Sequence, residues 1–200
     1  MAKIRLTKNE LKKQKDSLKM YKRYLPTLML KKQQLQGEIR ITDTRLKELL
    51  IELKQLDESF KEWIAVFGET GVFTSDILKV TGIRKGSGNI AGVAIPTFDG
   101  ADFVIAHYDL MSTPLWIDKA VECMKKALLL KLEADVVQEQ KRLLDLELRT
   151  TTQRVNLFEK IKIPEARDNI KKIQVYLGDQ QTAAVVRGKI AKSAFEKAGK

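Results

Sequence analysis

Residues 11–67 read LKKQKDSLKMYKRYLPTLMLKKQQLQGEIRITDTRLKELLIELKQLDESFKEWIAVF, and this stretch decides the fold. Apolar side chains recur in it alternately every four and every three residues. Fourteen of the seventeen positions on this rhythm are apolar or aromatic; the positions are 11, 14, 18, 21, 25, 28, 32, 35, 39, 42, 46, 49, 53, 56, 60, 63 and 67. A 3.5-residue repeat keeps one side of a helix, its seam, facing a partner helix and imposes a left-handed supercoil. We therefore expect one long helix over roughly 7–67 that forms half of a coiled coil.

A second stretch supplies the partner helix. Eleven of thirteen positions on its rhythm are apolar, namely Trp116, Ala120, Cys123, Ala127, Leu130, Ala134, Val137, Leu144, Leu148, Val155 and Phe158, with Lys141 and Thr151 as the exceptions. Beyond Phe158 the rhythm resumes one residue out of phase, at Ile163, Ala166, Ile170, Ile173, Leu177, Gln180, Ala184 and Ala191. This slip surrounds Pro164, and a proline inside a helix costs about 3 kcal/mol unless it opens a new turn.

Pro26 raises the same question in the first helix. The apolar rhythm passes straight through it, from Tyr21 to Leu25 to Leu28. We therefore expect a kink or a local unwinding at Pro26, without a break in the helix.

The middle of the chain has a different composition, since seven of the eleven glycines lie within residues 64–115. Short β-prone stretches occur at 77–80, 90–95 and 103–106. Asp99-Gly100 is a hairpin-turn signal, because both residues tolerate the positive φ that type I′ turns require. Pro114 stands just before Trp116, where we expect the second long helix to begin.

These patterns predict a mainly α fold: a long antiparallel two-helix left-handed coiled coil, joined by a small glycine-rich β-hairpin insert. The expected parts are an N-terminal long helix over 1–67, an insert with a short helix and the hairpin over 68–115, and a C-terminal long helix over 116–200. At 1.5 Å per residue the helices would be about 90 and about 120 Å long. The C-terminal helix would then extend about 30 Å beyond its partner as a single-helix tip.

The formal net charge of +11 is unevenly placed: +7 over residues 1–63, −2 over 64–115 and +6 over 116–200. Such a chain suits an acidic partner, either a nucleic acid, a membrane surface or a protein cavity, although a solvated helix face is the alternative. No apolar run approaches the roughly 18 residues that cross a bilayer, which predicts a soluble intracellular protein without membrane insertion. The single cysteine, Cys123, falls on the seam and is best interpreted as a small buried hydrophobe.

Residues for catalysis are scarce. The chain has no phosphate-binding G-x-x-x-x-G-K-[ST] loop, and His107 is its only histidine. Gly86-Ser87-Gly88 beside Arg84 and Lys85 could wrap an anion, but a flexible loop between strands is the favoured interpretation. We expect no catalytic residue, no metal site and no cofactor.

The C-terminal residues 176–192, YLGDQQTAAVVRGKIAK, differ from the rest of the helix because small residues and glutamines replace leucines. A slim helix of this kind suits insertion into a tight protein collar. The alternative is a frayed, weakly helical terminus.

Three stretches resemble the D subunits of the V-type/A-type ATPases (ATP synthases). They are the basic start with LPTL at 25–28 and LK at 30–31, the segment VNLFE at 155–159 that leads to Ile163-Pro164, and GDQQTA at 178–183 with KIAK at 189–192. The last motif is the most specific, because heptads alone fit many proteins. The long tail of eukaryotic members is absent, which favours a bacterial or archaeal member.

The resemblance implies a non-catalytic central-stalk rotor, a peripheral cytoplasmic component whose two termini lie inside a hexameric ring of catalytic A and B subunits. The F subunit would bind beside the coiled coil, and a funnel-like subunit would couple the insert-bearing end to a membrane ring carrying protons or sodium ions.

We expect the catalytic-ring contact to involve the residues Gln180, Gln181, Arg187, Lys189 and Lys192, and a regulatory hairpin to involve Arg84, Lys85, Asp99 and Gly100. Two other interpretations stay open, a basic coiled coil that binds nucleic acid and a tethering scaffold. Salt-sensitive nucleic-acid binding would favour the first of these, and a stable self-assembled dimer the second.

Overall fold

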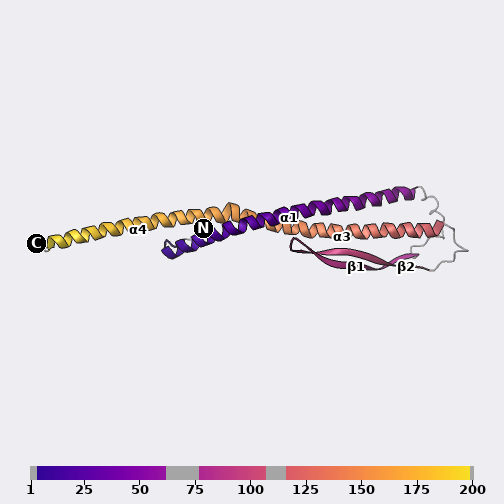
Figure 1. The fold of residues 1–200 in the computed structure, drawn as a ribbon, viewed down its shortest axis with the longest axis horizontal. Coiled ribbons are helices and arrows are strands. Elements are labelled where there is room, and N and C mark those ends of the chain that lie inside the picture. Colours follow the sequence, from indigo (N-terminus) through magenta and orange to yellow (C-terminus); the bar gives the residue numbers. More distant parts are fainter. Residues whose placement is uncertain (1–3, 62–76, 107–115, 199–200) are drawn as a thin grey trace. The chain divides into compact units, whose positions relative to one another are not determined.

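The computed structural model describes residues 4–61, 77–106 and 116–198 (Figure 1). In chain order its elements are helix α1 (Lys8–Lys61), strands β1 (Leu78–Ile90) and β2 (Val93–Ile105), helix α3 (Trp116–Asn156), a π-helical turn η1 (Leu157–Lys162) and helix α4 (Ile163–Ala198). This mainly helical chain with one small antiparallel sheet confirms the predicted fold class. The short helix expected within 68–115 does not lie in residues 77–106, and the remainder of that insert lies outside the described residues.

Helix α1 begins where a capping residue precedes the apolar rhythm. The Thr7 hydroxyl accepts a hydrogen bond from the Glu10 backbone N–H, at 3.3 Å, and Thr7 and Glu10 have the spacing of a capping box. The helix continues through Pro26, so the expected absence of a break is confirmed. All fifteen predicted seam positions from 11 to 60 are buried or half-buried, whereas positions 63 and 67 lie outside the described residues.

The chain divides into two compact units, Met1–Lys32 with Thr150–Lys200, and Gln33–Arg149. In the second unit, α1 and α3 run antiparallel, as contacts at two levels show. Leu35 packs with Leu144, and Leu49 packs with Ala134 and Val137. A higher residue number on α1 thus pairs with a lower one on α3, as an antiparallel seam requires.

In the first unit, the start of α1 packs beside the segment formed by the end of α3, η1 and α4. The rings of Tyr21 and Phe158 are in contact, with centroids 5.3 Å apart. Six residues of α3 and α4 are buried here: Thr151, Val155, Ile163, Ala166, Asn169 and Ile173. The helices of this unit therefore have a buried seam of their own, which reaches Ile173.

The predicted slip of the apolar rhythm has a structural counterpart in η1. At its end the Ile163 N–H donates to the Phe158 carbonyl, five residues back, where an α-helix would use the residue four back. A π-turn accommodates one more residue than an α-turn, so the phase of the seam changes by one residue here. Pro164 lies directly after it, in the first turn of α4.

The hairpin differs from the prediction in the position of its turn. Its turn residues are Ala91 and Gly92, with φ of 52° and 79°, and the Asn89 side chain accepts a hydrogen bond from the Gly92 N–H. Asp99-Gly100 therefore is not the turn; it lies inside β2. Because Arg84 pairs with Gly100 and Lys85 with Phe98, Asp99 is an extra residue at a β-bulge, and Gly100 takes the positive φ of 126° there.

The β-prone stretch 90–95 lies in both strands, because the turn divides it between β1 and β2. One related expectation was wrong. Gly86-Ser87-Gly88 is not a flexible loop, since it lies within β1 and pairs with residues 95–97. A side chain at Gly86 would place its Cβ 2.5 Å from the Thr97 hydroxyl oxygen, so glycine permits the close approach of the strands.

The hairpin packs along α3 at both of its ends (Figure 1). Near the open end, Leu78 packs with Ile117 and Val121 at the start of α3. Near the turn, Ile95 packs with Leu35 of α1 and Leu144 of α3, so three elements share one cluster. A two-stranded hairpin alone is at best marginally stable in water, and these contacts are what order it.

Candidate functional site

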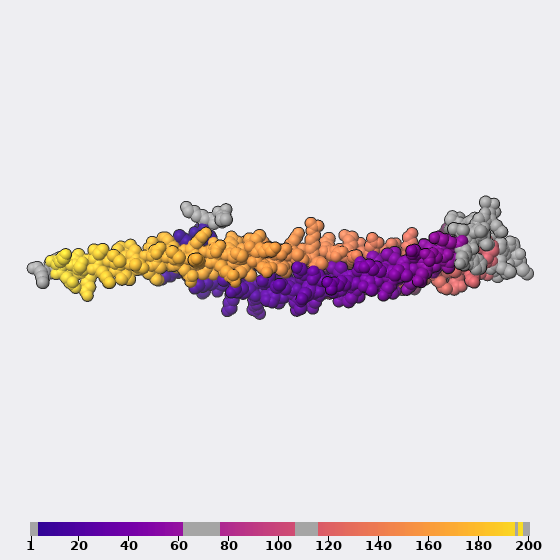
Figure 2. Space-filling view, turned by 90° about the horizontal axis from the view of Figure 1, so that it is seen from above, coloured from indigo at the N-terminus to yellow at the C-terminus, as the bar shows by residue number. Residues whose placement is uncertain are grey.

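The C-terminal end of α4 is the most exposed helical segment of the described chain. From residue 178 to residue 197 only Ala183 is half-buried among the residues whose side chains the structure describes. Figure 2 shows this end in yellow as a bare helix, and Figure 1 shows α4 extending beyond the first turn of α1. The seam therefore stops before Gln180, Ala184 and Ala191, which the apolar rhythm had included and which are exposed.

The five predicted tip residues are all exposed, but they do not form one patch. At 100° per residue, Gln180 and Arg187 share one side of the helix, Gln181 and Lys192 share a second, and Lys189 lies on a third. The Gln180 side chain donates to the Tyr176 hydroxyl at 3.3 Å, and Lys192 forms a long ion pair with Glu196 at 3.9 Å. This distribution suits a partner that surrounds the helix better than one that covers a single side.

Three aliphatic residues of the same segment were not among the predicted contact residues. Val185, Val186 and Ile190 are 59%, 49% and 62% exposed. They lie off the seam positions of the heptad rhythm, so their apolar character was the one available signal. The end of α4 thus exposes both cationic and aliphatic groups.

At the β-bulge, the structure brings together three of the four predicted hairpin residues. Arg84 lies opposite Gly100 in the ladder, and its guanidinium lies 3.5 Å from the Asp102 carboxylate. Asp99, the extra residue, is near the Thr97 hydroxyl, at 3.5 Å. Asp102 was not predicted; its place across the ladder from Arg84 depends on the bulge.

Lys85, the fourth residue, interacts electrostatically with a carboxylate of α3. The Glu139 carboxylate of α3 has a pKa below its ordinary value, chiefly through its hydrogen bond with Arg142 and also through the charge of Lys85. A further link is the Gln140 side-chain amide, which donates to the Pro96 carbonyl at 2.6 Å. The hairpin is therefore held to α3 by polar as well as apolar contacts.

Charged pairs flank the seam of the second unit. Lys141 of α3 donates to Asp43 of α1, and Arg45 of α1 donates to Glu133 of α3 at 2.7 Å. The hydrogen bond from Lys141, followed by that from Lys47, lowers the pKa of Asp43 to about 2. A charged residue at a seam position fixes register and orientation, so Lys141 pins the antiparallel pairing.

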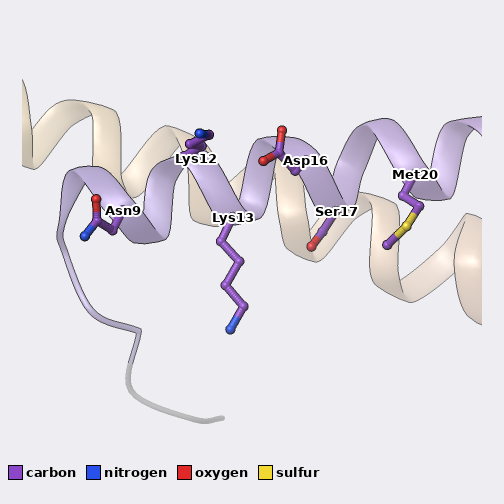
Figure 3. A pocket seen from close by; sticks show the side chains of 6 residues that line it. All are labelled: Asn9, Lys12, Lys13, Asp16, Ser17 and Met20. Atoms are coloured by element: carbon purple, nitrogen blue, oxygen red, sulfur yellow. The ribbon is translucent and has the colours of Figure 1, made fainter.

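The basic start of α1 carries a shallow groove of about 410 Å³ lined by Asn9, Lys12, Lys13, Asp16, Ser17 and Met20 (Figure 3). These residues recur at three- and four-residue spacing on one helix, so the groove is a surface depression and not an enclosed pocket. It offers positive charge, but its only hydroxyl, that of Ser17, has no histidine among the lining residues to act as a base.

The described ranges offer little for metal or membrane chemistry. They contain no group of three or more His, Cys, Asp or Glu side chains placed to hold a metal ion. None of their helices combines the length and the hydropathy of a membrane-spanning segment. His107 lies outside the described residues, and Cys123 is half-buried on the seam of α3.

The chain is similar to known proteins of one family over nearly its whole length. The family model of the ATP synthase D subunit matches residues 10–193. The V-type ATP synthase D subunit of Borreliella burgdorferi is 54% identical over 98% of this chain and 97% of its own length. Those of Chlamydia muridarum and Chlamydia caviae are 35% and 34% identical, over 96% of this chain and 96% and 94% of theirs. The chain therefore belongs to the D-subunit family of the V-type/A-type ATPases (ATP synthases).

Proposed function

We propose that this protein is the non-catalytic central rotor shaft of a V/A-type ATPase. It couples ATP hydrolysis or synthesis in a ring of A and B subunits to proton or sodium transport. One observation carries the proposal: each of two helical units has a buried apolar seam, and α4 then ends in a segment exposed on all sides. A transmitter of torque needs the first feature, and a surrounding catalytic ring needs the second.

The seam supplies torsional stiffness. Leu35, Leu49, Leu144 and Ile173 are fully buried, and interdigitated side chains of this kind pack at near-crystalline density. Twisting one helix about the other would have to separate such contacts at every level. The inter-helix pairs of Asp43 with Lys141 and of Arg45 with Glu133 oppose the same movement.

The exposed end of α4 is the part proposed to enter the catalytic ring. Its cationic groups give a diffuse attraction to an acidic collar, and its side chains are small enough to turn inside one. The F subunit would bind the coiled coil, and a funnel-like subunit would link the hairpin-bearing end to the membrane rotor. The shaft would then work in the cytoplasm, at the membrane periphery, and bind no nucleic acid.

Truncation of residues 178–200 tests the proposed seating. The deletion removes no buried residue of the described chain, so folding and binding of the F subunit should persist while capture by the A and B subunits weakens. Neutralising Arg187, Lys189 and Lys192 to Ala should weaken capture less, and its effect should fade at high salt, because exposed charges are screened beyond about 8 Å at physiological ionic strength.

The matched control neutralises the same number of cations on the paired part of α4, by changing Arg167, Lys171 and Lys172 to Ala. All three are exposed, so this variant loses the same charge without touching the end of the helix. It should lose less of its binding to the ring than the variant of the tip. If the truncated protein instead joined the ring normally and lost the F subunit, the proposed placement of α4 would be wrong.

The proposed lack of catalysis has a simple assay. The purified protein should hydrolyse no ATP, and its addition should change turnover by the assembled A and B ring. Hydrolysis that follows the isolated protein through purification would contradict the proposal.

We further propose that the hairpin regulates this turnover, since two helices could be joined by far fewer residues. Deletion of residues 84–106 should leave the coiled coil assembled and alter ATPase activity, but it would also uncover Leu35 and Leu144. A sharper variant changes only exposed groups, Arg84→Ala with Lys85→Ala. Unchanged turnover in both variants would reduce the hairpin to a spacer.

A further inference from the structure

The π-turn η1 lies between two buried stretches of the same seam. Before it, Thr151 and Val155 are 1% and 3% exposed; after it, Ile163 and Ala166 are 7% and 3% exposed. Within the turn, Leu157 and Ile161 are 41% and 54% exposed. The backbone therefore departs from α-helical geometry between two stretches of helix whose seam residues are buried.

The sequence shows what an uninterrupted α-helix would do here. Continued from Phe158 by steps of four and three, the seam would fall on Lys162, Glu165, Asn169, Lys172 and Tyr176. The structure instead buries Ile163, Ala166 and Ile173, with Ile170 and Leu177 half-buried, and leaves Glu165 and Lys172 exposed. Of the residues on the uninterrupted face, Asn169 is buried and Lys162 is half-buried. One residue corresponds to about 100° of helix rotation, and the π-turn absorbs that rotation.

Pro164 favours the same geometry. In an α-helix its ring would clash with the carbonyl of Lys160, and its missing N–H would leave that carbonyl without its usual partner. A wider turn placed directly before the proline moves the chain away from this clash. The excess residue and Pro164 thus both favour a π-turn at this position.

We propose that η1 is a register compensator: it stores one residue in excess of the heptad pattern, so that the end of α3 and the start of α4 present one continuous seam to α1. An exposed residue of the turn, such as Glu159 or Lys160, is then dispensable for packing, whereas a residue of the flanking helices is not. The turn is also the place where this pair of helices opens first, because Leu157 and Ile161 are exposed and few buried apolar contacts hold it. This inference concerns the fold alone and is independent of the proposed rotor function.

Single-residue deletions in the full chain test the proposal, in a Pro164→Ala background that lets an α-helix form. Deleting Glu159, or separately Lys160, brings Phe158 and Ile163 to a four-residue spacing, so the seam continues without a π-turn. Each deletion should keep the thermal midpoint at or above that of the background. Amides 161–164 should then exchange with solvent at least about ten-fold more slowly than in the background.

The matched control deletes Lys171, an exposed residue within the regular part of α4. This deletion puts part of the seam out of phase whatever the turn does, and it should lower the midpoint by more than about 5 °C. The proposal is overturned if deleting Glu159 or Lys160 lowers the midpoint as much as deleting Lys171. It is equally overturned if Pro164→Ala alone gives amides 161–164 the slow exchange expected of the deletions, since the excess residue would then not be what maintains the π-turn.

Discussion

Substitution of Ile95 by alanine should release the turn end of the hairpin from the helices. Ile95 is 4% exposed and packs against Leu35 and Leu144, each 0% exposed, so the substitution leaves a cavity that three elements share. Replacements of this kind cost about 2–5 kcal/mol. Because an isolated hairpin is marginal, we expect most of that cost to appear as local opening.

A cost of about 3 kcal/mol corresponds to an increase of about 100-fold in the opening equilibrium. Native-state hydrogen exchange would report it as a loss of protection at the amides of residues 88–95 that take part in the β-ladder. Protection within α1 and α3 should change far less. The Gln140 hydrogen bond to Pro96 remains in this variant, and Gln140→Ala should add only about 1 kcal/mol.

Val104→Ala is the matched control, since Val104 lies on the same hairpin and is 52% exposed. It should leave exchange near the turn unchanged. The reasoning is refuted if Ile95→Ala leaves these amides protected, or if Val104→Ala exposes them equally.

Three further outcomes follow from single residues. Lys141, and then Lys47, lower the pKa of Asp43 to about 2. The stability that this gives is complete above the unfolded pKa near 3.8 and is lost as pH falls through 2. Asp43→Asn should therefore show a smaller drop in thermal midpoint between pH 5 and pH 2 than the unchanged protein. Gly37→Ala should raise the free energy of unfolding by about 0.5–1 kcal/mol in urea titrations, because the glycine lies inside α1 with nothing within 4 Å of an added Cβ. Gly100→Ala should lower it by about 1–3 kcal/mol, because φ is 126° and the Arg84 guanidinium lies 3.0 Å from the added Cβ; equal stability of the two glycine variants would contradict both expectations.

Much of the helical architecture could be predicted from the sequence. Periodicity is a local property, so the seam of α1, the start of α3 at Trp116 and the one-residue slip after Phe158 were all visible in the spacing of apolar residues. The spacing did not show how the slip is accommodated. A kink, a break or a π-turn at Pro164 would each have fitted the same letters.

The candidate tip was also predictable in composition, because small residues and glutamines replace leucines from Gly178 onward. The point at which burial ends was not. The apolar rhythm runs on to Ala184 and Ala191, but α4 is exposed there. Periodicity shows which side of a helix could be buried, and only a partner segment decides whether it is.

The sequence by itself determined the two long helices and their apolar seams, because both rest on a pattern repeated along the chain. It also determined the membership of the D-subunit family, through motifs such as GDQQTA at 178–183. Tertiary structure decided the hairpin. Asp99-Gly100 has the local chemistry of a turn as much as Ala91-Gly92 does, and cross-strand register made one a bulge and the other the turn. That register is stabilised by burial of Ile95 between two helices, a contact between residues far apart in sequence that no local signal carries.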